Sequence, residues 1–171
     1  YSTDIQKQLY ISQLNQTISS DSSVQVETAK FAMVDLDKDD IPEIILWLTA
    51  NFNDDFGFEV LHYKDGGVYG YTLWYRTFMD LKEDGTFSFS QGASESGYGT
   101  ITFTKDGYTI DEITYSKLNI YSDNKDKISY FVNKASASYD EYLSAIIEQS
   151  RKADASWYNL TDKNIVKFLS N

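Results

Sequence analysis

The sequence contains no cysteine, and this absence excludes disulfide bonds, thiolate metal sites and a cysteine nucleophile. It contains one histidine, His62, and no zinc-protease, P-loop or dinucleotide-binding motif. A single histidine gives no basis for a Ser-His-Asp arrangement, so we expect His62 to be an ordinary packed or exposed strand residue. The single proline and the lack of low-complexity runs argue against a linker-rich array.

No stretch of about 18 apolar residues occurs, so the sequence predicts no transmembrane segment. No signal peptide is recognisable, and the start at Tyr1 without methionine leads us to expect a mature or trimmed form. The absence of cysteine fits a secreted protein of a Gram-positive bacterium, and it also fits many cytoplasmic proteins.

Basic residues are few: 15 Lys and Arg stand against 26 Asp and Glu, which gives a formal net charge of −11 and a pI near 4.4. Such a surface repels nucleic-acid phosphates and anionic lipids, so we expect neither as a partner. It favours divalent cations. The alternative is that the charge mainly keeps the protein soluble.

The chain of 171 residues and 19.6 kDa falls within the size range of one domain, and we predict a single domain over residues 1–171. A domain of about 150 residues buries roughly 70% of its unfolded surface and needs no disulfides. Hydrophobic residues make up 42% of the chain and aromatic residues 16%, which is typical of a folded protein.

The sequence predicts three helices, one near the N-terminus and two near the C-terminus. Each combines an apolar stripe at helical spacing with a capping pattern at its start. The helices with their caps are residues 3–19 with Thr3 and Gln6, a helix after Ser138 with Glu141, and residues 162–169 after Thr161.

The middle of the chain has the sequence patterns of strands. Residues 30–36 and 43–50 are near-continuous apolar runs, which are typical of strands buried on both faces. Three Asp-Gly pairs further on predict hairpin turns, because glycine adopts the positive φ of a tight turn freely. Residues 91–99 are rich in Gly and Ser, and we expect them to form a mobile hairpin loop. The Asp-Gly pairs are Asp65-Gly66, Asp84-Gly85 and Asp106-Gly107.

Strands gathered in one block with helices at both ends predict an α+β fold. We therefore expect an antiparallel β-meander sheet that is covered by one N-terminal and two C-terminal helices.

Residues 35–43, with the sequence DLDKDDIPE, carry the clearest chemical pattern. Carboxylates recur at alternate positions between the two apolar runs, and a tightly curled loop can turn such side chains inward. Calcium needs six to eight oxygen ligands at about 2.3–2.6 Å, some of which are backbone carbonyls. The sequence therefore predicts a structural calcium site between two central strands. The predicted ligands are Asp35, Asp37, Asp39, the carbonyl of Ile41, and Glu43.

This loop is not an EF-hand, because its twelfth position is Leu46 in a strand-like run and not a bidentate Glu. Lys38 adds a positive charge at the fourth position, and Asp40 replaces the glycine that makes the sharp turn at the sixth. The alternative is an empty acidic turn whose aspartates bond the loop's own backbone.

The segment FAMVDLDKDDIPEIIL, residues 31–46, resembles the F-x-L-x-D-L-D-G-D-G-I-P-E-L segment of uncharacterised extracytoplasmic proteins and lipoproteins from clostridial-type gut bacteria. Two C-terminal pieces, SYDEYLSAI and WYNLTDKNIVKFL, are similar to the helical ends of those proteins. The loop also resembles FG-GAP/VCBS-type calcium loops, although those come in tandem arrays and this one is single. The chain departs from the pattern at Lys38 and Asp40, where the family usually has Gly. The resemblance implies a secreted or surface-anchored protein and no known reaction.

Aromatic side chains indicate where a ligand could bind, because tyrosine and tryptophan stack on sugar rings or anchor protein partners. Three tyrosines are expected to share one strand face as a possible ligand surface, with Trp74 on the opposite face. The alternative is that this face fills the core, and we expect Trp47 and Trp157 to be core residues. The three tyrosines are Tyr69, Tyr71 and Tyr75.

No pattern selects a catalytic site. Residues 92–96 only approximate the G-x-S-x-G nucleophile motif, and the spacing of the many Asp and Glu residues singles out no carboxylate pair. We therefore expect no enzymatic activity. The sequence predicts an extracytoplasmic binding or interaction module at a bacterial surface, with an unknown protein or glycan as its partner. The alternatives are a carbohydrate-binding module and, with less support, a hydrolase.

Overall fold

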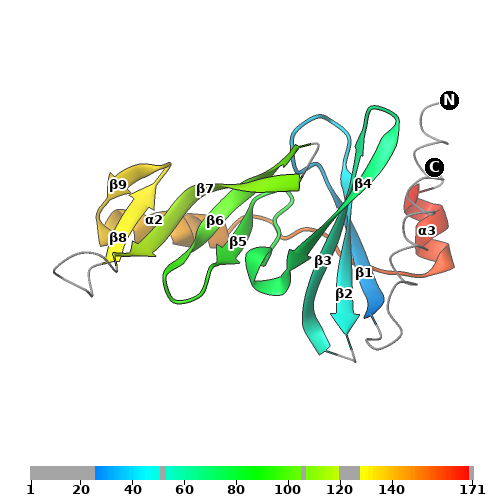
Figure 1. The fold of residues 1–171 in the computed structure, drawn as a ribbon, viewed down its shortest axis with the longest axis horizontal. Coiled ribbons are helices and arrows are strands. Elements are labelled where there is room, and N and C mark those ends of the chain that lie inside the picture. The colour runs from blue at the N-terminus through cyan, green and yellow to red at the C-terminus, as the bar shows by residue number, and fades with distance from the viewer. Residues whose placement is uncertain (1–25, 51–52, 105–106, 120–127, 170–171) are drawn as a thin grey trace. The chain divides into compact units, whose positions relative to one another are not determined.

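The computed structural model of the protein describes residues 26–50, 53–104, 107–119 and 128–169 (Figure 1). Within these residues the chain is mostly β. Ten strands form two antiparallel sheets of five strands each, accompanied by two α-helices and a short 3-10 helix.

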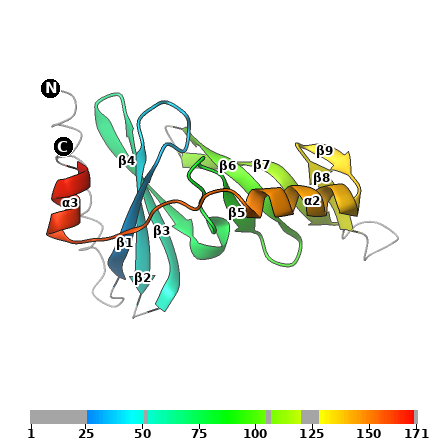
Figure 2. The ribbon, with the colours of Figure 1, turned by 180° about the vertical axis from the view of Figure 1, so that it is seen from behind.

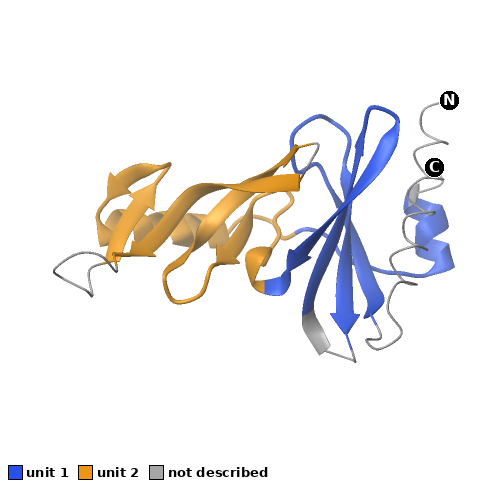
Figure 3. Ribbon diagram, viewed as in Figure 1, with its two compact units in different colours: residues 1–75, 155–171 blue, residues 76–154 orange. Residues whose placement is uncertain are grey.

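The chain divides into two compact units (Figure 3). The first contains residues 1–75 and 155–171, and the second contains residues 76–154. Each unit has one of the two sheets. The prediction of a single domain over residues 1–171 concerns independent folding, which this division does not test, and it stays a prediction.

The sheet of the first unit has the strand order β10-β1-β2-β3-β4. Its central strand β2 is buried on both faces, as its continuous apolar run predicts. The acidic loop connects β1 and β2, which pair as antiparallel neighbours with Val34 opposite Glu43. The strands are β1 (Val26–Val34), β2 (Glu43–Ala50), β3 (Asn53–Lys64), β4 (Gly67–Trp74) and β10 (Tyr158–Asn159).

Helix α3 (Asp162–Leu169) begins where the sequence predicts it, and Thr161 Oγ1 accepts the backbone N–H of Asn164 (3.3 Å) as its cap. Its apolar side packs on one face of the first sheet, where the ring of Phe168 lies 6.2 Å from that of Phe31. The buried side chains of this core are Phe31, Ile44, Leu46, Leu48 and Leu61.

The β3–β4 hairpin confirms the first Asp-Gly turn. Asp65 and Gly66 have φ values of 50° and 82°, the positive pair that a tight hairpin turn requires. The second turn differs, because Gly85 donates to the carbonyl of Lys82 (3.0 Å) and closes a tight turn that leads into β5 rather than joining two long strands. The third pair includes Asp106, which lies outside the described residues.

The sheet of the second unit has the order β5-β6-β7-β8-β9, and helix α2 (Tyr139–Ser150) packs against β6, β7 and β8 (Figure 2). The predicted capping box is confirmed, because Ser138 Oγ accepts the N–H of Glu141 (3.3 Å) and the Glu141 carboxylate accepts the N–H of Ser138 (2.7 Å). The strands are β5 (Phe87–Ser90), β6 (Glu95–Thr104), β7 (Gly107–Leu118), β8 (Ile128–Val132) and β9 (Ala135–Ala137).

The prediction of an α+β fold with one meander sheet under three helices is wrong. The described chain is mostly β, in two sheets, with two α-helices. The single meander breaks after β4, because the 3-10 helix Tyr75–Thr77 and the turn around Gly85 take the chain out of the first sheet before β5 begins. The predicted N-terminal helix, residues 3–19, lies outside the described residues.

Only residues 91–94 of the Gly/Ser-rich stretch form the predicted hairpin turn, between β5 and β6, whereas residues 95–99 belong to strand β6. Gly97 and Gly99 belong to this strand because β7 passes very close to it. A Cβ at Gly97 would meet the carbonyl oxygen of Thr114, and one at Gly99 would meet that of Asp111. Glycine at these positions therefore permits close strand contact rather than a loop.

Among the described residues, no helix has the length and apolar character needed to cross a membrane.

Candidate metal centre

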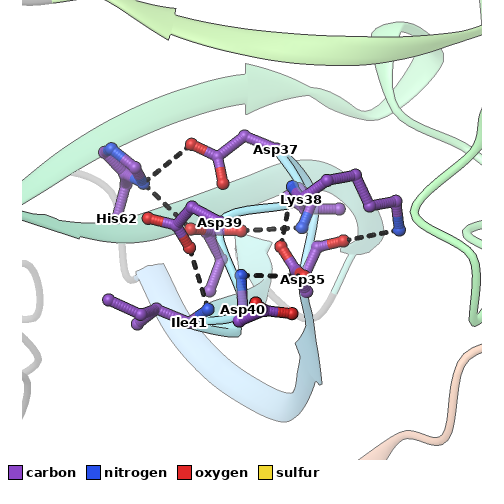
Figure 4. A network of polar contacts seen from close by, with 9 residues as sticks. Asp35, Asp37, Lys38, Asp39, Asp40, Ile41 and His62 are labelled. Atoms are coloured by element: carbon purple, nitrogen blue, oxygen red, sulfur yellow. Dashed lines mark hydrogen bonds and ion pairs between the residues drawn. The ribbon is translucent and has the colours of Figure 1, made fainter.

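The acidic loop that joins β1 to β2 is held by its own side chains (Figure 4). The Asp35 carboxylate accepts hydrogen bonds from the backbone N–H groups of Lys38 (2.8 Å) and Asp40 (3.2 Å). The Asp39 carboxylate accepts the N–H of Ile41 (2.8 Å). Two of the three alternating aspartates thus make the local bonds that a self-bonded acidic turn would have.

Lys38 and Asp40 both have a φ of 67°. This is the left-handed region that glycine adopts most easily, and these are the two positions where the resembled segment carries glycine. The loop therefore adopts that conformation with non-glycine residues, at an energetic cost. The Lys38 ammonium donates to the backbone carbonyl of Asp35 (3.0 Å), and it points away from Asp37 and His62 (Figure 4).

Asp35, Asp37 and Asp39 form what we call the outer group. Each offers one carboxylate oxygen, and the three oxygens lie within 4.8 Å of one another. Asp39 is exposed, whereas Asp35 and Asp37 are partly buried. Oδ1 of Asp37 is buried and has no hydrogen-bond partner among the described residues. The structure therefore brings together three of the five predicted calcium ligands.

Glu43, the fourth predicted side-chain ligand, is fully buried at the start of β2. Its Oε2 accepts the N–H of Leu36 (2.8 Å), and its Oε1 lies 2.9 Å from Nδ1 of His62. The same His62 nitrogen is 3.9 Å from Oδ2 of Asp37. We call Asp37, Glu43 and His62 the inner group, whose ligand atoms lie within 4.8 Å of one another. Asp37 thus belongs to both groups, and Glu43 belongs only to the inner one.

Burial raises the pKa of Glu43 from 4.5 to about 7, because the charged form loses its hydration. Hydrogen bonds from His62 and from the backbone N–H of Leu36 act in the opposite direction, and the negative charge of Asp37 raises the pKa further. A proton or a metal cation at this place would each neutralise a charge that burial makes costly.

His62 is the site residue that sequence reasoning missed. It is 1% exposed and lies beside two carboxylates, whereas we expected an ordinary strand residue. The strand register explains why His62 lies beside Glu43. Ile44 of β2 lies opposite Leu61 of β3, so the adjoining Glu43 and His62 lie together on the face opposite to that of Ile44 and Leu61. A correct pairing of the second apolar run with the strand that follows it would have found this contact.

The predicted aromatic ligand face is divided in the structure. Tyr69 on β4 is 42% exposed, and Tyr71 is half-buried with its ring 6.4 Å from that of His62. Tyr75 lies beyond the strand, in the 3-10 helix, and stacks on Phe58 with ring centroids 6.1 Å apart. Trp74 is 64% exposed.

Two of the tryptophans belong to an aromatic cluster in the first unit. Trp47 and Trp157 are half-buried and pack edge to face, with ring centroids 5.1 Å apart. Phe58 fills the space between them and Tyr75. These rings contribute to packing, but Trp47 and Trp157 are only partly buried and do not belong to the buried core, so the expectation that they are core residues is not confirmed.

Within the part of the chain that the structure describes, the outer and inner groups are the two sets of side chains that could hold a metal ion. The outer group presents only carboxylate oxygens, which suit hard cations, whereas the inner group adds an imidazole nitrogen. Comparisons with protein-family models, curated proteins and solved structures found no match to this chain.

Proposed function

We propose that the acidic loop, residues 35–43, binds Ca²⁺ as a structural ion in a non-enzymatic binding or interaction module. We further propose that this module acts outside the cytoplasm, secreted by or anchored to the surface of a Gram-positive bacterium. Its partner would be a protein or a glycan at that surface.

The observation that carries the calcium proposal is the convergence of the outer group. Three carboxylates from alternate loop positions place oxygens within 4.8 Å, although like charges at such distances repel one another. The ammonium of Lys38 bonds a carbonyl and points away from Asp37, so it does not occupy the centre of the group. A divalent cation among the three oxygens would convert this repulsion into attraction, and the remaining ligands would be the Ile41 carbonyl and water.

A structural role is more consistent with the position than a catalytic one. The loop joins two paired strands of the first sheet, so an ion there would hold β1 and β2 together at the end where the loop connects them. Extracellular calcium modules bind with dissociation constants of about 10⁻⁴–10⁻³ M. Calcium at 100 times the dissociation constant would add about 2.7 kcal/mol to the stability of the folded state.

The extracytoplasmic location is supported by chemistry and by resemblance. A net charge of −11 and the absence of cysteine are compatible with a secreted acidic protein. The resemblance of residues 31–46 to a segment of extracytoplasmic bacterial proteins points the same way. Weak calcium sites are also most useful where calcium is abundant, as it is outside cells.

The test compares calcium binding by the wild-type protein and by Asp39→Asn. Binding is measured by calorimetry and by thermal unfolding. Asn can still accept the N–H of Ile41, so this variant removes a ligand charge while the local turn is kept. We expect the wild-type melting temperature to rise by about 5–10 °C in saturating calcium relative to chelator, and the rise to be lost in the variant.

The matched control is Asp80→Asn, which removes one carboxylate from an exposed position in the second unit. Asp80 also has a positive φ (48°), which Asn tolerates as well. The control should keep the full calcium response. A calcium response that is absent from the wild-type protein, or that is equal in Asp39→Asn, would reject the calcium site and leave the loop as a self-bonded acidic turn.

A carbohydrate ligand is the second candidate, and the exposed rings of Tyr69 and Trp74 on β4 favour it. The two side chains lie on opposite faces of the strand, so a sugar ring would stack on one of them at a time. Titration with a panel of oligosaccharides, followed by tryptophan fluorescence, tests this role. A saturable change that Trp74→Ala or Tyr69→Ala abolishes would support it, and a flat response to the whole panel would favour a protein partner.

A further inference from the structure

We propose that the inner group, formed by Asp37, Glu43 and His62, is a second metal site that takes a transition-metal ion of the zinc class. The proposal does not rest on calcium binding, because the two groups have different donors and share only Asp37.

The donor positions suit a small ion. Nδ1 of His62 and Oε1 of Glu43 are 2.9 Å apart. If an ion bound both atoms with bonds of about 2.1 Å, the donor–metal–donor angle would be about 90°. Oδ2 of Asp37 is 3.9 Å from the same nitrogen, so the third donor lies within a small side-chain rotation of the ion. Oδ1 of Asp37 has no hydrogen-bond partner among the described residues, so that rotation breaks no hydrogen bond made by this atom.

The donor chemistry distinguishes this site from the outer group. Imidazole nitrogen favours zinc, cobalt, nickel and copper, whereas calcium prefers oxygen ligands alone. Two carboxylates balance the charge of a divalent ion. That balance is needed here because Glu43 and His62 are 0% and 1% exposed, and an uncompensated charge in such a place would be costly.

The donors are also held in place by the sheet. Glu43 lies on β2 and His62 on β3, two neighbouring strands of the first unit. The backbone N–H of Leu36 bonds Oε2 of Glu43 (2.8 Å) and leaves Oε1 directed at His62. Outer hydrogen bonds of this kind orient metal ligands in known sites. Donors on paired strands with a fixed carboxylate are preorganised for binding.

The composition of the chain simplifies the test of this site, because His62 is the only histidine in the sequence and there is no cysteine. A zinc site with an imidazole or thiolate ligand must therefore include His62. The probe is ZnCl₂, added to untagged protein in calcium-free buffer and followed by competition with a chromophoric chelator. The variant is His62→Asn, whose side-chain amide lies close to the position of Nδ1 but does not ligate zinc.

We expect one zinc ion per chain, with an affinity that falls roughly tenfold or more in His62→Asn and in Asp37→Asn. The affinity should be unchanged in Asp39→Asn, which alters only the outer group, and in Asp80→Asn. In the matching CaCl₂ titration the pattern reverses for two variants: Asp39→Asn loses calcium binding and His62→Asn keeps it. Failure of the zinc site and failure of the calcium site are thus separate results.

A measurement on the wild-type protein covers the case in which His62→Asn does not fold. The ring signals of the single histidine in the NMR spectrum should shift on addition of one equivalent of ZnCl₂. Ring signals that stay in place while zinc binds would overturn the proposal, because the ion would then lie elsewhere on the acidic surface. Equal zinc affinity in the wild-type protein and a folded His62→Asn would overturn it as well.

Discussion

The buried carboxyl of Glu43 makes the stability of the metal-free protein depend on pH. Burial raises its pKa from 4.5 to about 7, so between these values the folded state holds a proton that the unfolded state has released. The contribution of Glu43 to the free energy of unfolding is therefore fully present below pH 4.5, and it is lost as the pH rises through 7. At about 1.4 kcal/mol per pKa unit, a rise from 4.5 to about 7 corresponds to about 3.5 kcal/mol, most of which is lost between pH 4.5 and 8.

The assay is urea unfolding of the wild-type protein and Glu43→Gln at several pH values from 4.5 to 8, in the presence of chelator. Glutamine keeps the size of the side chain and cannot ionise, while His62 and Asp37 face it as before. The other titrating groups, including Glu59 with its raised pKa, are common to both proteins. The wild type should therefore lose about 3 kcal/mol relative to the variant across this range. A difference between the two proteins that is constant with pH would refute the reasoning.

Two further predictions concern the packing of each unit. Leu46→Ala removes a fully buried side chain from the core of the first unit and should lower the free energy of unfolding by about 2–5 kcal/mol in urea titrations. Ser138→Ala removes the capping side chain of α2 and should cost about 1 kcal/mol, whereas Ser138→Asp, which keeps a capping oxygen, should recover most of it. A loss below 1 kcal/mol for Leu46→Ala would mean that the site collapses around the smaller side chain.

Local signals in the sequence were reliable where a few neighbouring residues decide the structure. The helices after Ser138 and Thr161, the turn at Asp65-Gly66 and the second apolar run appear as predicted, whereas the first run belongs to a strand that spans Val26–Val34 and is only partly buried. In each case the controlling interaction spans only a few residues, such as a cap, a positive-φ turn or a short loop between paired strands.

The fold class was mispredicted because sheet membership is not a local property. The strands from residue 53 to residue 132 have similar alternation of apolar and polar residues. This alternation does not indicate which sheet a strand joins. The Gly/Ser pattern of residues 91–99 was misleading for a related reason. Gly97 and Gly99 lie in β6 because of the close approach of β7, a strand that starts several residues later in the chain.

The sequence by itself determined the acidic loop and its alternating aspartates, because these residues are neighbours in the chain and their spacing places them together. Only the tertiary structure decided that Glu43 leaves this group and meets His62, 19 residues further on, inside the sheet. The physical reason is that the register of β2 against β3 sets which side chains share a buried face. That register depends on the packing of both strands rather than on the sequence of either one.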